Sequence, residues 1–357
     1  MSTTSLALPT AEEEIWRYSR IDELDLASFR LGTTRTVIEN VEGIVLAPNE
    51  AQVSVGLAMA TAADVFAQLN TDSASVIALK VERNAVVPST VLITHHLDES
   101  GIVAYPRLVI DVGENSEITV IERFVSADDV VSLVVPVVEL RAAQASRVTY
   151  LAINELGRRT WQISHQQAVG DRDSTMRLFS VALGGDYARV RAEVRLVGQG
   201  ASAQQTALYF ADGNQMHDFR TWQVHEAPRT HSDLLFKGAV KDTAKSVYTG
   251  LIKIGEHAAG SQAFQTNRNL TLSHGAWAQS VPNLEIETND VKCSHASTIG
   301  PIDDDQRFYL ESRGVPPHIA ERLVVLGFFD EVINRLPESS FTAGLRAQVS
   351  TKLGRAR

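Results

Sequence analysis

The sequence predicts a mainly β protein, a parallel β-helix or related solenoid with helical regions at both ends. From about residue 75 to residue 300, short segments with alternating apolar residues follow one another with almost no helical pattern between them. A small polar turn that runs into such a strand recurs, and its aligned positions lie 30, 28, 28 and 29 residues apart. These positions are Ser116, Ser146, Ser174, Ser202 and His231. So constant a spacing indicates stacked repeats, each of which buries its apolar face only against its neighbours.

The later turns support the same architecture. After residue 232 they come at about half the interval, near Asp242 and His257, as if each repeat consisted of two strand-and-turn steps. The alternative is an antiparallel sandwich, since its strands also recur about every 8–12 residues. The long constant period favours the β-helix, which we expect to occupy residues 76–301.

Helical patterns are confined to the two ends of the chain. Residues 11–18 follow Thr10, a suitable N-cap, and their glutamates complement a helix dipole. Helix-forming residues recur over 53–69, and β-branched residues take over near residue 75. Residues 1–75 are therefore expected to form an N-terminal helical or mixed region.

The C-terminal part contains three expected helices. Residues 303–313 are acidic at the start and basic at the end, as a helix dipole favours. Gly314 supplies a stop, and a second helix can begin at Pro316 and Pro317 and extend to residue 335. A basic third helix is expected over 340–353. Residues 302–357 are thus expected to form a C-terminal helical domain placed on the β-helix.

The composition is that of a folded globular protein, with 44% hydrophobic and 21% charged residues among 357. A net charge of −10 opposes binding to phosphate backbones, so nucleic acid is not expected as a partner. The start of the chain is polar and then acidic, unlike a secretory signal, and the most apolar stretch, residues 130–140, is too short to span a membrane. The single cysteine suits a reducing compartment, so we expect a cytoplasmic protein without a membrane anchor.

The strongest chemical signal is the string NDVKCSH at residues 289–295. If this string is extended, Cys293 and His295 project from the same face, because side chains alternate along a strand. A thiolate and an imidazole suit iron–sulfur units or zinc, so the pair is a credible half of a metal site. A closed site needs about four ligands, so the others must come from another chain. The alternative is a buried structural cysteine beside a hydrogen-bonded histidine.

Six short motifs occur in a distinctive order and spacing between residues 236 and 314. They are FKG at 236–238, YTG at 248–250, QTNRNL at 265–270, PNLEI at 282–286, DVKCSH at 290–295 and FYLESRG at 308–314. Together they resemble the core of the SufB/SufD family of iron–sulfur cluster assembly proteins. LPT at 8–10 and EIWRY at 14–18 resemble the start of its SufD branch. The resemblance covers nearly the whole chain and implies a right-handed parallel β-helix flanked by helical domains, in agreement with the repeats.

The resemblance also implies a division of chemistry between two related subunits. In SufB-type chains a sulfur-handling cysteine lies in the strand that matches residues 269–273, where this chain has Ser273. In SufD-type chains the histidine of the CSH string acts at the SufB–SufD interface with the cysteine beside it, which carries over to His295 and Cys293. These two residues are the expected cluster-assembly and interface residues, and the expected ligands of a transient iron–sulfur cluster shared with a SufB-like partner.

Further partners are implied for the C-terminal helices. The resemblance implies that a SufC-like ATPase docks there, that its nucleotide-driven dimerisation opens the SufB–SufD interface, and that a cysteine desulfurase system acts indirectly. The expected docking side chains follow helical spacing, although the same stripe could pack on the β-helix. They are Ile319, Leu323, Leu326, Phe329 and Ile333. The sequence has no GxxxxGKS/T string, which fits ATPase activity supplied by another chain. Whether the complex uses a reduced flavin stays open.

The expected function is a non-enzymatic scaffold subunit of a SufBCD complex for iron–sulfur cluster assembly. One alternative is a SufB-like scaffold that acts as a homodimer, and this chain alone could also form a homodimer. Another is a β-helical carbohydrate-active enzyme, for which Glu285, Glu287 and Asp290 form the acidic cluster near the CSH string.

Overall fold

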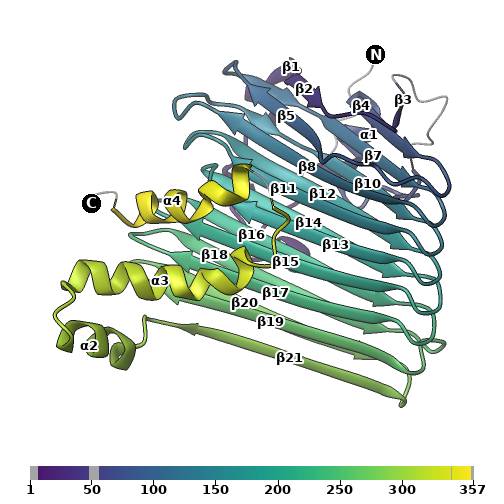
Figure 1. Ribbon diagram of the computed structural model, residues 1–357. Helices are drawn as coiled ribbons and strands as arrows, with labels where there is room; N and C mark the ends of the chain where they lie inside the picture. Colours follow the sequence, from purple (N-terminus) through teal and green to yellow (C-terminus); the bar gives the residue numbers. More distant parts are fainter. Residues whose placement is uncertain (1–6, 48–55, 339, 355–357) are drawn as a thin grey trace.

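The computed structural model describes residues 7–47, 56–338 and 340–354. Its main body is a parallel β-helix in which two sheets face each other (Figure 1). The chain alternates between the sheets, so neighbouring strands of one sheet are joined through a strand of the other. The predicted β-helix is confirmed and is consistent with right-handed winding, whereas the antiparallel sandwich is wrong.

The strands of the two sheets stack in chain order. In sheet A the order is β3 (Val45–Ala47), β4 (Ser75–Val81), β7 (Pro106–Val112), β10 (Val137–Ala142), β12 (Trp161–Gly170), β14 (Tyr187–Leu196), β16 (Met216–His225), β18 (Lys245–Ile254) and β20 (Trp277–Ile286). Three short strands join it at the side: β1 (Arg30–Gly32), β6 (Ile102–Ala104) and β9 (Leu133–Val134). In sheet B the order is β2 (Arg35–Glu39), β5 (Val91–Leu97), β8 (Glu117–Ser126), β11 (Arg147–Glu155), β13 (Thr175–Ala182), β15 (Ser202–Ala211), β17 (His231–Val240), β19 (Ser261–Thr271) and β21 (Val291–Gly300).

In three successive coils, one turn repeats with the same internal hydrogen bond. The hydroxyls of Ser116, Ser146 and Ser174 are buried and donate to the carbonyl three residues earlier, at 2.7 Å for Ser146 and 2.6 Å for Ser174. The residue before each serine has a left-handed backbone, with φ values of 53°, 58° and 56°. The recurring polar turn of the sequence is therefore a defined left-handed turn that leads from sheet A into sheet B.

The strand register corrects the predicted repeat at two positions. Thr175, which follows Ser174, pairs with Ser202, and Ser202 pairs with His231. The turn residues equivalent to Ser174 are therefore Ala201 and Thr230, each one residue before the predicted position. Ala201 has no hydroxyl, so the predicted alignment of the turns chose Ser202, one residue too late, at this coil.

The two ends of the β-helix differ. At the N-terminal end β2 pairs antiparallel with β5, and β3 pairs antiparallel with β4. Val41 and Ile44 pack against the apolar core of the first coils and close this end. At the other end β20 and β21 are the last strands of their sheets within the described residues, and Figure 1 shows β21 along the uncovered lower edge. We refer to these as the closed end and the open end.

The N-terminal segment forms 3-10 turns, and the predicted helix over residues 11–18 is wrong. The carbonyl oxygens of Ile15 and Arg17 accept hydrogen bonds from Arg189 and Arg220, each at 2.5 Å, and not from helical amides. Tertiary contacts thus override the local helix preference. The turns span Glu14–Trp16, Ile21–Glu23 and Leu26–Ser28.

The first α-helix, α1 (Val65–Ser73), is shorter than the helical pattern over residues 53–69. Backbone amides of Gly56, Ala58 and Met59 donate to the Glu139 carboxylate at 2.9–3.0 Å, which holds this stretch in a loop. Residues 53–55 lie outside the described residues.

The three C-terminal helices lie where the sequence predicts them. They are α2 (Asp304–Ser312), α3 (Pro317–Ile333) and α4 (Ser340–Gly354). Figure 1 shows them together on one side of the β-helix, and α3 contacts β15 and β17 of sheet B. Within the described residues, no helix combines the length and apolar character needed to cross a membrane.

Candidate functional site

Cys293 and His295 lie in β21, the last strand of sheet B. Their neighbours in β19 are Ala263 and Gln265, which pair with Cys293 and His295 respectively. Burial alternates along β19, and Ala263 and Gln265 belong to its buried, lumen-facing set. Because paired residues of a parallel ladder point to the same side, both Cys293 and His295 face the lumen at the open end. The structure thus brings the two side chains to one face, as their spacing predicts.

Cys293 is half-buried at this end. It packs against the apolar cluster that contains Ile252, Ile254 and Ala263. Burial raises the pKa of the Cys293 thiol. The free chain therefore favours the protonated thiol, and a metal ion or a cationic group near it is needed to favour the thiolate.

His295 is exposed at the open end. Its imidazole makes no hydrogen bond to any other residue that the structure describes. The imidazole is therefore available to a ligand or to a second protein. An imidazole nitrogen serves as an iron or zinc ligand when it is neutral.

The two side chains form only part of a metal site. In the described part of the chain, no group of three or more histidine, cysteine, aspartate or glutamate residues could hold a metal ion. Since a closed site needs about four ligands, Cys293 and His295 could supply two of them. The remaining ligands of any cluster held here must come from outside this chain or from the cluster itself.

An apolar rim lies beside the pair on both last strands. Leu284 and Ile286 of β20 and Ile299 of β21 are 41%, 42% and 41% exposed. Leu284 pairs with the fully buried Ile252 and therefore faces the lumen side. Exposed apolar residues on uncovered edge strands are typical of a surface that another chain covers.

The comparison with known proteins identifies the family. Residues 95–328 match the family described as SUF system FeS cluster assembly, SufBD core domain. The chain belongs to the SufBD family. An iron–sulfur cluster assembly SufBD family protein of Mycobacterium tuberculosis is 34% identical over 359 residues, covering 97% of this chain and 89% of the relative. The iron–sulfur cluster assembly protein SufD of Escherichia coli is 29% identical over 381 residues, with the same coverage of 97% and 89%. SufD of Bacillus subtilis is 29% identical over 262 residues, or 72% of this chain and 60% of the relative.

In this SufBD chain, Ser273 has a structural contact. It lies just after β19, and its hydroxyl oxygen accepts a hydrogen bond from the backbone amide of Asp242 at 3.0 Å. This bond joins two neighbouring turns. The position that the resemblance assigns to a sulfur-handling cysteine in SufB-type chains therefore fixes a turn here.

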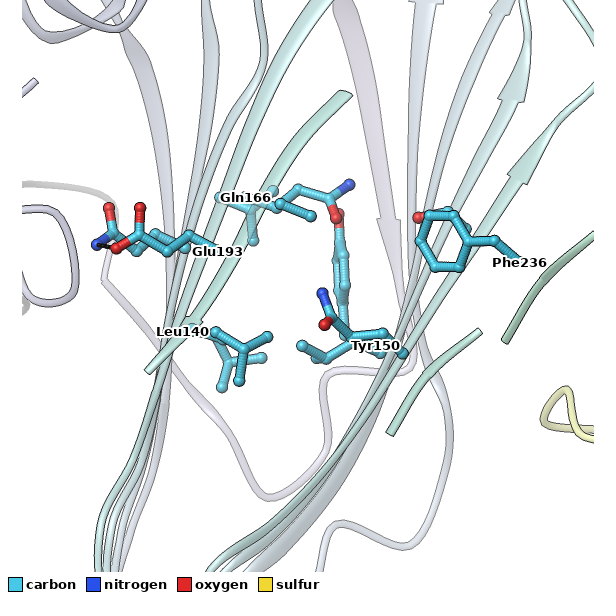
Figure 2. Close-up of a pocket in the computed structure, with 13 residues that line it drawn as sticks. Leu140, Tyr150, Gln166, Glu193 and Phe236 are labelled. Carbon is cyan, nitrogen blue, oxygen red and sulfur yellow. Dashed lines mark hydrogen bonds between the residues drawn. The ribbon is translucent and has the colours of Figure 1, made fainter. Parts of the chain in front are cut away.

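The lumen of this SufBD chain contains a small cavity whose lining is mainly apolar. Figure 2 shows Leu140 and Gln166 reaching into it from sheet A and Tyr150 from sheet B, with Glu193 on the outer side. Its volume of about 20 Å³ is enough for one water molecule. This cavity is too small for an organic substrate.

The acidic cluster considered for a carbohydrate-active enzyme is engaged in ion pairs. Glu285 and Glu287 both lie near the Lys253 ammonium, at 2.5 Å and 3.7 Å. Asp290 lies in the following turn, where its backbone carbonyl accepts from the amide of Gly260 at 2.7 Å. The carboxylates of Glu285 and Glu287 therefore neutralise the Lys253 ammonium on the outer face of sheet A.

The five expected docking residues of α3 occupy different environments. Phe329 and Ile333 are buried at 0% and 7% exposure in the core between α3 and the β-helix. Leu326 packs against the same core, and Ile319 is half-buried. Leu323 is 44% exposed. In this structure the buried pair is not accessible to another protein, and the stripe mainly packs α3 on the β-helix.

Two exposed aromatic residues of α2 were not among the expected docking residues. Phe308 is 71% and Tyr309 58% exposed. Both lie in the motif FYLESRG, one of the motifs that carry the resemblance. The sequence does contain a signal for them. Because α2 has few apolar residues, the helix buries little surface, and its aromatic side chains are expected to stay exposed.

Proposed function

We propose that this chain is a non-enzymatic scaffold subunit for iron–sulfur cluster assembly in the cytoplasm, paired through its open end with a SufB-like subunit. The observation that carries the proposal is the contrast between the two ends of the β-helix. The closed end is covered by the chain's own antiparallel strands, whereas the open end carries Cys293 and His295 beside an apolar rim. The cluster is the cargo of this site and is held jointly with the partner.

The chemistry of the open end requires a second chain. Two ligands are too few for a cluster, and the half-buried Cys293 thiol needs a metal ion or a cation to favour the thiolate. The edge strands β20 and β21 leave backbone groups unpaired, which a strand of the partner can satisfy. Pairing there would place the ligands of two subunits on either side of one cluster.

A SufC-like ATPase is proposed to dock on the exposed side of α2 and α3. Phe308, Tyr309 and Leu323 supply exposed apolar area there. β21 ends at Gly300 and α2 begins at Asp304, so a short connection joins the docking helix to the strand that carries His295. Movement of α2 by the ATPase would therefore reach the cluster site directly.

Replacing His295 by alanine tests this function. In the complex reconstituted anaerobically with SufB-like and SufC-like subunits, iron and sulfide, we expect about tenfold slower cluster formation, followed by visible absorption. The complex itself should remain intact in size-exclusion chromatography, because His295 is exposed and its imidazole packs in no apolar core. The matched control is His257→Ala, an exposed histidine in the turn before β19. Cluster formation at the wild-type rate in the His295→Ala complex would contradict the proposed role.

A further inference from the structure

We propose that Gln265 is a positioning residue for His295: its side-chain carbonyl accepts the Nδ1–H of the imidazole and directs Nε2 out of the open end. This inference rests on the proposed function and deepens it, because it explains how the imidazole of an exposed histidine is oriented towards a shared cluster.

The strand register brings the two side chains together. Gln265 of β19 pairs with His295 of β21, and both face the lumen side. Neighbouring strands lie about 4.8 Å apart, so side chains at paired positions stack directly on one another. The two groups are not hydrogen-bonded in this structure, and a side-chain rotation would bring the carbonyl of Gln265 into contact with Nδ1 of His295.

The carboxamide of Gln265 has an unused acceptor. The residue is 2% exposed, and its Oε1 has no hydrogen-bond partner among the described residues. A buried acceptor without a partner is costly, and a free N–H one strand away would satisfy it. His295, whose imidazole has no partner among the same residues, carries such a donor.

The opposite sheet is shaped to admit this carboxamide. A Cβ atom on Gly250 would lie 2.7 Å from both Nε2 and Oε1 of Gln265, so a larger residue there would displace the amide. The same Cβ atom would lie 2.4 Å from the Tyr248 hydroxyl, which is hydrogen-bonded to the Thr221 hydroxyl at 2.9 Å. Gly250 thus leaves space for the Gln265 carboxamide beneath the open end.

A fixed acceptor decides which nitrogen of a neutral imidazole carries the hydrogen. Ligating histidines almost always donate their other N–H to such an acceptor, which sets the ring orientation and tautomer. With Nδ1–H bound to Gln265, the lone pair of Nε2 faces the partner subunit. Gln265 itself touches neither the partner nor the cluster.

The tautomer of His295 tests the inference in the full-length chain. The ¹⁵N shifts of its ring are recorded by NMR at a pH where imidazole is neutral, with assignment by loss of the signal in His295→Ala. The wild type is expected to show mainly the Nδ1–H form, and Gln265→Leu to shift the ratio by about fivefold towards the other form. The matched control is Gln205→Leu, a buried lumen glutamine deeper in the β-helix whose Oε1 also has no partner among the described residues.

Two further variants guard against a simple loss of folding. Gly250→Ala keeps Gln265 but displaces its carboxamide, and should change the tautomer ratio as Gln265→Leu does. Gln265→Glu keeps an acceptor and should restore the Nδ1–H form. An unchanged ratio in Gln265→Leu and Gly250→Ala, or an equal change in Gln205→Leu, would overturn the inference.

Cluster formation separates this inference from the proposed function. We expect the Gln265→Leu complex to assemble clusters about tenfold more slowly than the wild type. If His295→Ala assembles normally, the proposed function fails whatever the tautomer. If His295→Ala is impaired while Gln265→Leu leaves both tautomer and rate unchanged, the inference on Gln265 fails alone.

Discussion

Replacing Ile299 by aspartate is expected to weaken association with a SufB-like subunit by at least about 100-fold. In the free chain Ile299 is 41% exposed, so the new carboxylate remains hydrated and costs little. In the proposed pair the same position is covered, and the carboxylate would be buried without a partner charge. Isothermal titration calorimetry with the purified partner measures the difference in Kd.

The control for this prediction lies at the opposite end. Val86 is 64% exposed beside the first coil of sheet B, where it bridges to Glu117. Val86→Asp adds the same charge to an apolar surface residue but should leave the Kd unchanged. Wild-type affinity in Ile299→Asp, or an equal loss in Val86→Asp, would show that the open end is not the contact surface.

Removing the carboxylate of Asp218 is expected to lower the free energy of unfolding by about 3–5 kcal/mol. Asp218 is fully buried, and its two oxygens pair with the guanidinium groups of Arg189 and Arg220, the latter at 2.9 Å. Asp218→Ala leaves both buried cations without their counter-charge. The same arginines bind the carbonyls of Ile15 and Arg17, so the N-terminal segment should loosen as well.

Urea unfolding followed by tryptophan fluorescence measures this effect. Trp16 is buried 4.0 Å below the Arg189 guanidinium and reports on the segment directly. The control is Glu226→Ala, which breaks the pair with Arg195, where both side chains are 38% exposed. A half-exposed ion pair contributes about 0–1 kcal/mol to the free energy of unfolding. A loss of less than about 1 kcal/mol in Asp218→Ala would contradict a structural role for the buried charges.

The β-helix could be predicted because its turns repeat in the sequence. Ser116, Ser146 and Ser174 occupy the same turn in successive coils, since each uses its hydroxyl to close the turn on the carbonyl three residues earlier. The pattern failed where the hydroxyl is absent at Ala201, because nothing else in the sequence marks the register of that coil.

The N-terminal helix was predicted wrongly for a reason that lies far along the chain. Its capping residue and acidic first turn are suitable for a helix, but the carbonyls of Ile15 and Arg17 are taken by arginines about 170–200 residues later. A local pattern contains no information on such partners. The helices α2 and α3 were predictable because charged residues, Gly314 and the prolines at 316 and 317 mark their ends locally.

For the candidate site, the sequence predicted that Cys293 and His295 share one face but not which face. The side that they occupy follows from their register with Ala263 and Gln265, and the exposure of His295 follows from the position of β21 as the last strand. Helical spacing likewise identified an apolar stripe on α3. It could not show that Phe329 is covered by the chain's own β-helix whereas Leu323 stays exposed.

The central claim is that the open end is the surface through which this SufBD chain pairs with a SufB-like subunit. Backbone hydrogen–deuterium exchange, compared between the free chain and the complex, tests it most directly, because pairing would protect amides that the edge strands leave unpaired. We expect new protection in β20 and β21, around Leu284 and His295, and no change in β2 and β3 at the closed end. Unchanged exchange in β20 and β21 within a stable complex, or protection confined to the closed end, would contradict the account.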